Sequence, residues 1–275
     1  MSVLFAGLLG IIQGLTEFLP VSSSGHLVLA QSLFGSMFDI ESGSYMLFDI
    51  MLHLGTLVAV IIAFWRDVKE LVVEAIKWIL DGFKIRNKPY RRFIVLILVS
   101  MIPMVAVLFV KDKIETVFSS PLVVGVCLLI TAVILLFSDQ MPKGDKDVRD
   151  ATWKDALIIG IMQGFATIPG ISRSGSTIAG GLFRGFDRQF AVKFAFIMSL
   201  PVIFGANLLS VGDALNEASA SAVSMPCYIV GILAALISGL LAIKMVNYIS
   251  RSGRFRGFSI YCAIVGVITI VVNLI

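Results

Sequence analysis

Residues 13–26, QGLTEFLPVSSSGH, and residues 169–177, PGISRSGST, interrupt two apolar regions that extend over 3–35 and 156–185. Each interruption combines a proline, which ends helices, with the serine and glycine residues that favour helix N-termini. We therefore do not expect either region to form one continuous membrane span. Each is predicted to form a re-entrant helical hairpin, that is, two short helices that enter the membrane and return.

The composition of the chain is that of an integral membrane protein. Of its 275 residues, 58% are hydrophobic and 15% are charged, and the mean hydropathy is +0.97. Soluble domains carry about 25% charged residues. Apolar runs of about 20 residues are long enough to cross a bilayer, and they occur near 46–65, 93–110, 120–138, 190–210, 226–247 and 257–275. The sequence thus predicts an all-α polytopic membrane protein with six transmembrane helices.

The Lys and Arg residues cluster in the loops on one side of these predicted spans. Eight lie between Arg66 and Arg92, and others lie at 143–154, 184–193 and 244–256. Because cytoplasmic loops are enriched in Lys and Arg, this side is predicted to face the cytoplasm and both termini to lie outside. The stretch 66–92 is expected to form an amphipathic helix on the cytoplasmic surface. No nucleic-acid-binding motif accompanies the basic residues, so no nucleic acid partner is expected.

The chain contains an internal repeat with an offset of 150 residues. The segment GIIQG at 10–14 aligns with GIMQG at 160–164, and SSSG at 22–25 aligns with SRSG at 172–175. Over positions 10–35 there are eight identities, where average composition predicts about one or two. We interpret the chain as one membrane domain, 1–275, made of repeat 1 (1–140) and repeat 2 (150–275).

Each repeat consists of a broken hairpin followed by three spans. An odd number of spans turns the second repeat upside down relative to the first, so an inverted-topology repeat is predicted. In such architectures the functional site tends to lie near the midplane of the membrane, where the broken helices meet.

The two hairpins contain three side chains that are rare at bilayer depth, Glu17, His26 and Arg173. A charge there costs about 2.5–3.5 kcal/mol on insertion scales, so these residues mark a candidate site. Arg173 can bind phosphate oxygens bidentately, and helix N-termini attract anions through their free N–H groups. Neighbouring hydroxyls can complete the shell of a phosphate site: Ser22, Ser23, Ser24, Ser172, Ser174 and Thr177.

Two further pairs of polar residues have helical spacing. Gln13 and Glu17 are four residues apart and share a helix face, and their oxygens suit a hard divalent cation. Asp49 and His53 have the same spacing in the first span. For that pair we expect a satisfied structural contact, with contact to Arg173 as the alternative.

Both motifs resemble the signature regions of the undecaprenyl pyrophosphate phosphatase family, which is linked to bacitracin resistance. The resemblance extends over essentially the whole chain in length, number of spans and inverted repeat. It implies a multi-pass enzyme of the bacterial cytoplasmic (inner) membrane that hydrolyses undecaprenyl pyrophosphate to undecaprenyl phosphate and inorganic phosphate. It further implies recycling of this lipid carrier for cell-wall synthesis, a site toward the outer face, and dependence on Mg²⁺ or Ca²⁺.

Position by position, the resemblance implies catalytic roles for Glu17, Ser23, His26 and Arg173, with Ser22, Ser24, Ser172, Ser174 and Thr177 around the phosphate. Glu17 and Gln13 are the expected metal ligands, although Gln13 stands where some members carry a first glutamate. Ser23 activated by His26 is the expected nucleophile, with His26 itself or water as the alternatives.

The main alternative function is a secondary transporter or channel for a phosphate-bearing anion, because inverted repeats with broken helices are typical of transporters. A carrier has no obvious need for a hydroxyl cluster beside a histidine and a carboxylate, and this favours the hydrolase. Additional flipping of the lipid stays open. The expected partners are the polyprenyl pyrophosphate and membrane lipids, and the sequence leaves a homodimer open.

Overall fold

The computed structural model describes residues 1–34, 46–84, 88–110, 114, 120–218, 223–252 and 254–274. Within these ranges the regular elements are helices, and one isolated bridge joins Lys146 to Phe186. Six helices are long and apolar enough to cross a membrane: α3 (Met46–Ala63), α5 (Pro89–Leu108), α7 (Pro121–Gln140), α10 (Arg188–Ala218), α11 (Met225–Ser252) and α12 (Arg256–Leu274). The predicted all-helical membrane protein with six spans is confirmed.

Each interrupted apolar region forms a pair of short helices that contact one another. The first pair is α1 (Val3–Phe18) and α2 (Ser23–Phe34), and the second is α8 (Trp153–Phe165) and α9 (Arg173–Phe183). The longest of the four, α1, has 16 residues and is about 24 Å long. None of the four therefore crosses a hydrocarbon core of about 30 Å alone.

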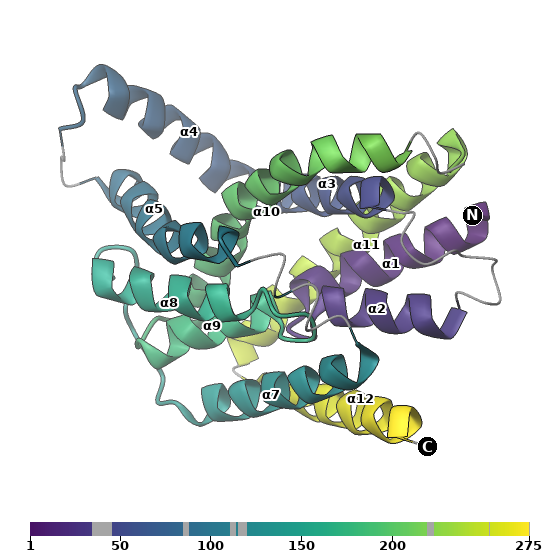
Figure 1. Cartoon of the computed structure of the whole chain (residues 1–275). Helices are drawn as coiled ribbons and strands as arrows, with labels where there is room; N and C mark the ends of the chain where they lie inside the picture. The colour runs from purple at the N-terminus through teal and green to yellow at the C-terminus, as the bar shows by residue number, and fades with distance from the viewer. Residues whose placement is uncertain are drawn as a thin grey trace.

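Helices from the two halves of the chain pack against each other. Helix α1 lies along α11, α8 lies along α5, and α7 lies along α12. Figure 1 shows both termini at one end of the molecule and α4 (Trp65–Leu80) at the opposite end. This packing brings two connecting segments into the interior of the molecule: residues 19–22 between α1 and α2, and residues 166–172 between α8 and α9. We call these segments the two breaks.

Glycines aligned by the repeat permit the closest of these helix crossings. A Cβ atom at Gly10 of α1 would lie 2.4 Å from the carbonyl oxygen of Gly231 in α11. A Cβ atom at Gly160 of α8 would lie 2.2 Å from the carbonyl oxygen of Ser100 in α5. Helices in a membrane associate largely through such close packing, because lipid tails are as apolar as the side chains they touch.

Helix α4 is held to α5 by a buried ion cluster centred on Arg91, which is 1% exposed. Arg91 donates from Nε to Glu74 at 3.1 Å and from a terminal nitrogen to Asp81 at 2.6 Å. Burial opposes ionisation of Glu74, but hydrogen bonds from Lys88 and Arg91 hold the pKa of its carboxyl below the ordinary value. The cluster fixes the angle at which α4 leaves the bundle.

The surface helix is shorter than the predicted stretch 66–92. It ends at Leu80, because Gly82 adopts a φ of +66° that ends a right-handed helix, and Pro89 then begins α5. The prediction of a single helix over 66–92 was therefore wrong in its extent.

The glycine crossing between α8 and α5 can be tested with Gly160→Ala. The added methyl group collides with the backbone of Ser100, so we expect a loss of about 1–3 kcal/mol in stability. Thermal unfolding in detergent measures it. Gly205→Ala in α10, where a Cβ atom meets nothing within 4 Å, is the control and should not lower the melting temperature. Equal melting temperatures for the two variants would contradict this account of the crossing.

Candidate active site

The two helix pairs break in the same way, with a serine capping the helix that follows. The Ser22 hydroxyl accepts the backbone N–H of Gly25 at 3.2 Å, and the Ser172 hydroxyl accepts that of Gly175 at 3.0 Å. These serines and glycines are the residues that the internal repeat aligns. Ser22 also has a φ of +74°, a conformation that costs a non-glycine residue free energy and that clusters at functional sites.

The two breaks lie against each other although they are about 150 residues apart in the chain. The Ser174 hydroxyl donates to the carbonyl oxygen of Leu19 at 3.1 Å. A Cβ atom at Gly25 would lie 3.1 Å from Cα of Gly170, and one at Gly175 would lie 3.2 Å from Cβ of Pro20. The N-termini of α2 and α9 are thereby brought to one place.

Helix α7 supports the second break through Thr131, a residue that sequence reasoning did not single out. The hydroxyl of Thr131 accepts the backbone N–H of Ser172 at 3.0 Å, and its one proton is shared between the carbonyl oxygens of Gly170 at 3.2 Å and Cys127 at 3.1 Å. A single buried threonine thus satisfies two backbone groups of an irregular segment, which has no water to bond within a membrane.

Glu17 is the centre of the site and is buried, with an exposed fraction of 6%. One carboxylate oxygen contacts the Arg173 guanidinium from the opposite half of the chain. The other oxygen accepts the Ser23 hydroxyl at 2.7 Å and the Gln13 side-chain amide at 3.0 Å. The predicted meeting of Glu17 with Arg173 is therefore present in the structure.

His26 lies on α2 but is bonded to other partners than Ser23. Its Nδ1 atom is 2.8 Å from the carbonyl oxygen of Ser22, and its Nε2 atom is 2.8 Å from the hydroxyl of Tyr261 in α12. A carbonyl only accepts, so Nδ1 carries the proton and Nε2 of the neutral ring accepts from Tyr261. The expected hydrogen bond between Ser23 and His26 is absent, because Ser23 turns to Glu17 instead.

The remaining hydroxyls are engaged within the two breaks. Ser22 and Ser172 cap helices, Ser24 lies at the surface 3.4 Å from the Ser22 hydroxyl, and Thr177 donates to the carbonyl of Arg173 at 2.9 Å. Their hydrogen bonds hold the breaks together, and their part in binding phosphate stays a prediction.

His53 of α3 approaches the same carboxylate, which the sequence alone did not indicate. Its Nδ1 atom is 2.8 Å from the backbone carbonyl of Asp49, and its Nε2 atom is 3.9 Å from Glu17. The expected pair between the side chains of Asp49 and His53 is not formed, because His53 bonds the backbone carbonyl of Asp49 and the carboxylate oxygen Oδ1 of Asp49 is buried without a hydrogen-bond partner. The only signal for this role was a histidine inside a predicted span.

The space beside this constellation is small. A cavity of about 10 Å³ is lined by Glu17, Arg173, Thr177 and Ser199, among others, and such a volume holds about one water molecule. A phosphate group can bind there only if Arg173 turns away from Glu17 or the helices separate.

Comparison with known proteins gives a consistent result over the full length. The family model described as bacitracin resistance protein BacA matches residues 6–268. An undecaprenyl-diphosphatase of Methanosphaera stadtmanae is 41% identical over 285 residues, covering 100% of this chain and 99% of its own. One of Halothermothrix orenii is 43% identical over 265 residues, covering 96% and 95%. One of Bacteroides fragilis is 43% identical over 271 residues, covering 97% and 96%.

The contact between Glu17 and Arg173 can be measured by a double-mutant cycle on thermal stability. Glu17→Gln or Arg173→Gln alone leaves the other charge without its partner, whereas the double variant removes both. We expect the pair to be coupled by about 1–3 kcal/mol, so the double variant is more stable than the two single losses added together predict. Strict additivity of the two losses would show that these side chains do not interact.

Proposed function

This chain belongs to the bacitracin resistance protein BacA family, and from that premise we propose that it hydrolyses undecaprenyl pyrophosphate to undecaprenyl phosphate and inorganic phosphate. Relatives that match it over nearly their whole length are named undecaprenyl-diphosphatases. Six apolar spans suit a substrate carried in the membrane. The observation that carries the proposal is the contact of Arg173 with Glu17, since it joins the two sequence motifs into one charged site.

We propose that the two short helix pairs are re-entrant hairpins inserted from opposite faces of the bilayer. The packing supports this arrangement, because α1 of the first half lies on α11 of the second, while α8 of the second lies on α5 of the first. The site would open toward the outer face of the bacterial inner membrane. The outer face would then be the end of the molecule where both termini lie, opposite the basic helix α4 (Figure 1).

In this proposal the pyrophosphate competes with Glu17 for the Arg173 guanidinium. A guanidinium presents a planar fork of donors that matches two phosphate oxygens. The N-termini of α2 and α9 face the same place, and their free N–H groups and positive dipole ends favour an anion. Substrate binding would release the Glu17 carboxylate for chemistry.

Ser23 is the proposed nucleophile, with Glu17 as its base. The Ser23 hydroxyl already donates to Glu17 at 2.7 Å, a distance suited to proton transfer. Its oxygen would attack the terminal phosphorus while its proton passes to Glu17. The bond from that phosphorus to the bridging oxygen breaks, and undecaprenyl phosphate leaves with the electron pair. Water then cleaves the serine phosphate and releases inorganic phosphate.

His26 is less suited to activate Ser23, because both of its ring nitrogens have other partners. It lies one turn along α2 from Ser23. The two alternatives to attack by Ser23 are direct attack on the phosphorus by His26 and direct attack by water.

A divalent cation, Mg²⁺ or Ca²⁺, is part of the proposal, with Gln13 and Glu17 as its protein ligands. The Gln13 oxygen is buried without a hydrogen-bond partner and lies on the helix face of Glu17. No group of three or more His, Cys, Asp or Glu side chains suited to a metal occurs among the described residues. Two protein oxygens are enough for Mg²⁺ when substrate phosphates supply further ligands. The bound cation would neutralise charge on those phosphates.

Replacement of Ser23 and Arg173 tests the proposed chemistry. We expect Ser23→Ala and Arg173→Ala to lower turnover of a polyprenyl pyrophosphate about 10²–10³-fold, because each removes a group that acts on the reacting phosphate. Phosphate release in detergent is the measurement. Ser138→Ala is the matched control, since that hydroxyl only donates to the carbonyl of Leu135 in α7.

Acid quenching followed by mass spectrometry should trap a phosphate on Ser23. Near wild-type turnover by Ser23→Ala would exclude the serine nucleophile. Anion uptake into proteoliposomes without phosphate release would instead support the transporter.

The metal assignment predicts the effect of Gln13→Glu. A second carboxylate should lower the Mg²⁺ concentration for half-maximal turnover about tenfold, because the charge of the ligands tunes affinity for hard cations. It should also enlarge the rise in melting temperature that Mg²⁺ produces, which is a readout independent of catalysis. Gln189→Glu, an exposed change outside the site, is the control. An unchanged Mg²⁺ response in Gln13→Glu would remove Gln13 from the proposed ligands.

A further inference from the structure

We propose that a groove between α3 and α11 binds the phosphate head group and acyl chain of an anionic membrane phospholipid. This α3–α11 groove is a cavity of about 500 Å³ lined by Ala63, Leu240, Ile243, Lys244, Asn247, Tyr248 and Arg251. Its lining contains no residue of the candidate active site. The inference does not depend on the proposed function.

The groove lies at the depth of the lipid head groups. The membrane-crossing part of α11, Met225–Arg251, has 27 residues and is about 40 Å long. It exceeds a hydrocarbon core of about 30 Å by roughly 10 Å. Lys244 and Arg251 are the only charged residues of this part, so we place the excess at its C-terminal end, where the last two turns extend into the interfacial region at the end of the molecule rich in Lys and Arg. Tyr248, which is 74% exposed, is typical of the aromatic belt found there.

The lining side chains are ordered as a phospholipid would require. Leu240, Lys244, Tyr248 and Arg251 have the spacing of one helix face. The apolar residues Leu240 and Ile243 come from the part of α11 nearer the membrane interior, and the two cations come from the part nearer the solvent. An acyl chain would lie on the apolar part, while Lys244, Arg251 and the Asn247 amide would surround the phosphate. Basic pockets between membrane helices recognise anionic head groups in this way.

The two cations of the groove lack acidic partners. Among the described residues, no carboxylate lies within ion-pair distance of Lys244 or Arg251. Some basic side chains at this end are paired, such as Arg184 with Asp155 at 2.6 Å and Arg188 with Asp139 at 3.3 Å. Unpaired positive charge above an apolar surface is complementary to a lipid phosphate and its chain.

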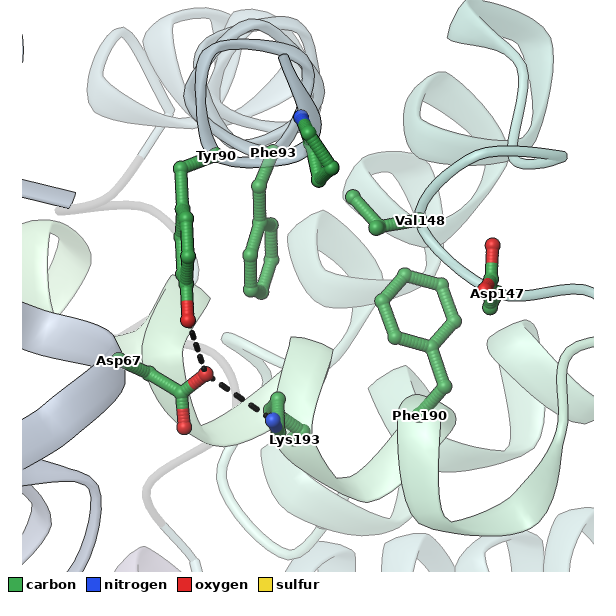
Figure 2. Close-up of a pocket in the computed structure, with 8 residues that line it drawn as sticks. Asp67, Tyr90, Phe93, Asp147, Val148, Phe190 and Lys193 are labelled. Carbon is green, nitrogen blue, oxygen red and sulfur yellow. Dashed lines mark hydrogen bonds and ion pairs between the residues drawn. The ribbon is translucent and has the colours of Figure 1, made fainter. Parts of the chain in front are cut away.

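A second cavity at the same end of the molecule differs from the α3–α11 groove because its lysine is paired with a carboxylate. Figure 2 shows this cavity of about 330 Å³, in which Lys193 and Tyr90 both point to Asp67. The Lys193 ammonium lies 3.0 Å from Asp67, so its charge is already compensated, and Asp147 adds a second carboxylate to the lining. The second cavity is therefore unsuited to an anion, and of these two cavities the α3–α11 groove is the one whose cations have no acidic partner in the described part of the chain.

The test counts bound lipids by native mass spectrometry of the whole chain after removal of endogenous lipid. Phosphatidylglycerol is titrated against phosphatidylcholine of the same chain length. We expect one site that prefers phosphatidylglycerol, and Lys244→Ala/Arg251→Ala should weaken it about 25-fold, since each basic residue near a lipid phosphate contributes about fivefold. Lys143→Ala/Arg149→Ala also removes one lysine and one arginine from the same end, and it should leave this site within about twofold of wild type.

Equal binding of both lipids by the wild type would overturn the inference, and so would an equal loss in both double variants. Glycerol phosphate at millimolar concentration should not displace the lipid, because it lacks the acyl chain. Displacement by it would make the groove a site for soluble phosphate. If the alanine variant does not fold, Lys244→Gln/Arg251→Gln, which keeps the side-chain bulk, replaces it.

Discussion

The structure depends on the pairing, inside the helix bundle, of the buried Glu17 carboxylate with the Arg173 guanidinium, whose side chain is 25% exposed. Glu17 and Arg173 come from opposite halves of the chain, and neither charge is tolerable there alone. Their contact requires that the two breaks meet. The serine caps, the hydrogen bond from Ser174 to Leu19 and the close glycine crossings all serve this meeting. A charge pair thus sets the geometry of a largely apolar fold.

The same pair also determines what the site can do. With Arg173, Ser23 and Gln13 all bonded to it, the Glu17 carboxylate is fully satisfied when no phosphate is bound. A phosphate that takes Arg173 would leave the carboxylate with the Ser23 hydroxyl, the contact that the proposed chemistry needs. Stability without substrate and reactivity with it therefore rest on one set of hydrogen bonds. The small cavity beside Glu17 accords with such a closed arrangement.

We propose two phosphate-binding sites in this protein, the one at Arg173 and the α3–α11 groove. They differ in whether an acidic side chain pairs with their cations. Arg173 is neutralised by Glu17 and is available only by exchange, which suits a substrate that must bind and leave. Lys244 and Arg251 have no acidic partner among the described residues and lie at the rim of the membrane. Unpaired cations there suit a lipid that stays bound.

The sequence alone predicted the class of fold, the six spans, the two breaks and the meeting of Glu17 with Arg173. These follow from local properties: apolar length, the helix-ending effect of proline, and the cost of charge in lipid. Only the tertiary structure decided the partners. Ser23 bonds to Glu17 rather than to His26, His26 bonds to Tyr261 of the last helix, and His53 joins the carboxylate. Such contacts depend on the rotation of each helix about its axis and on the packing of residues distant in sequence, which helical spacing within one segment does not encode.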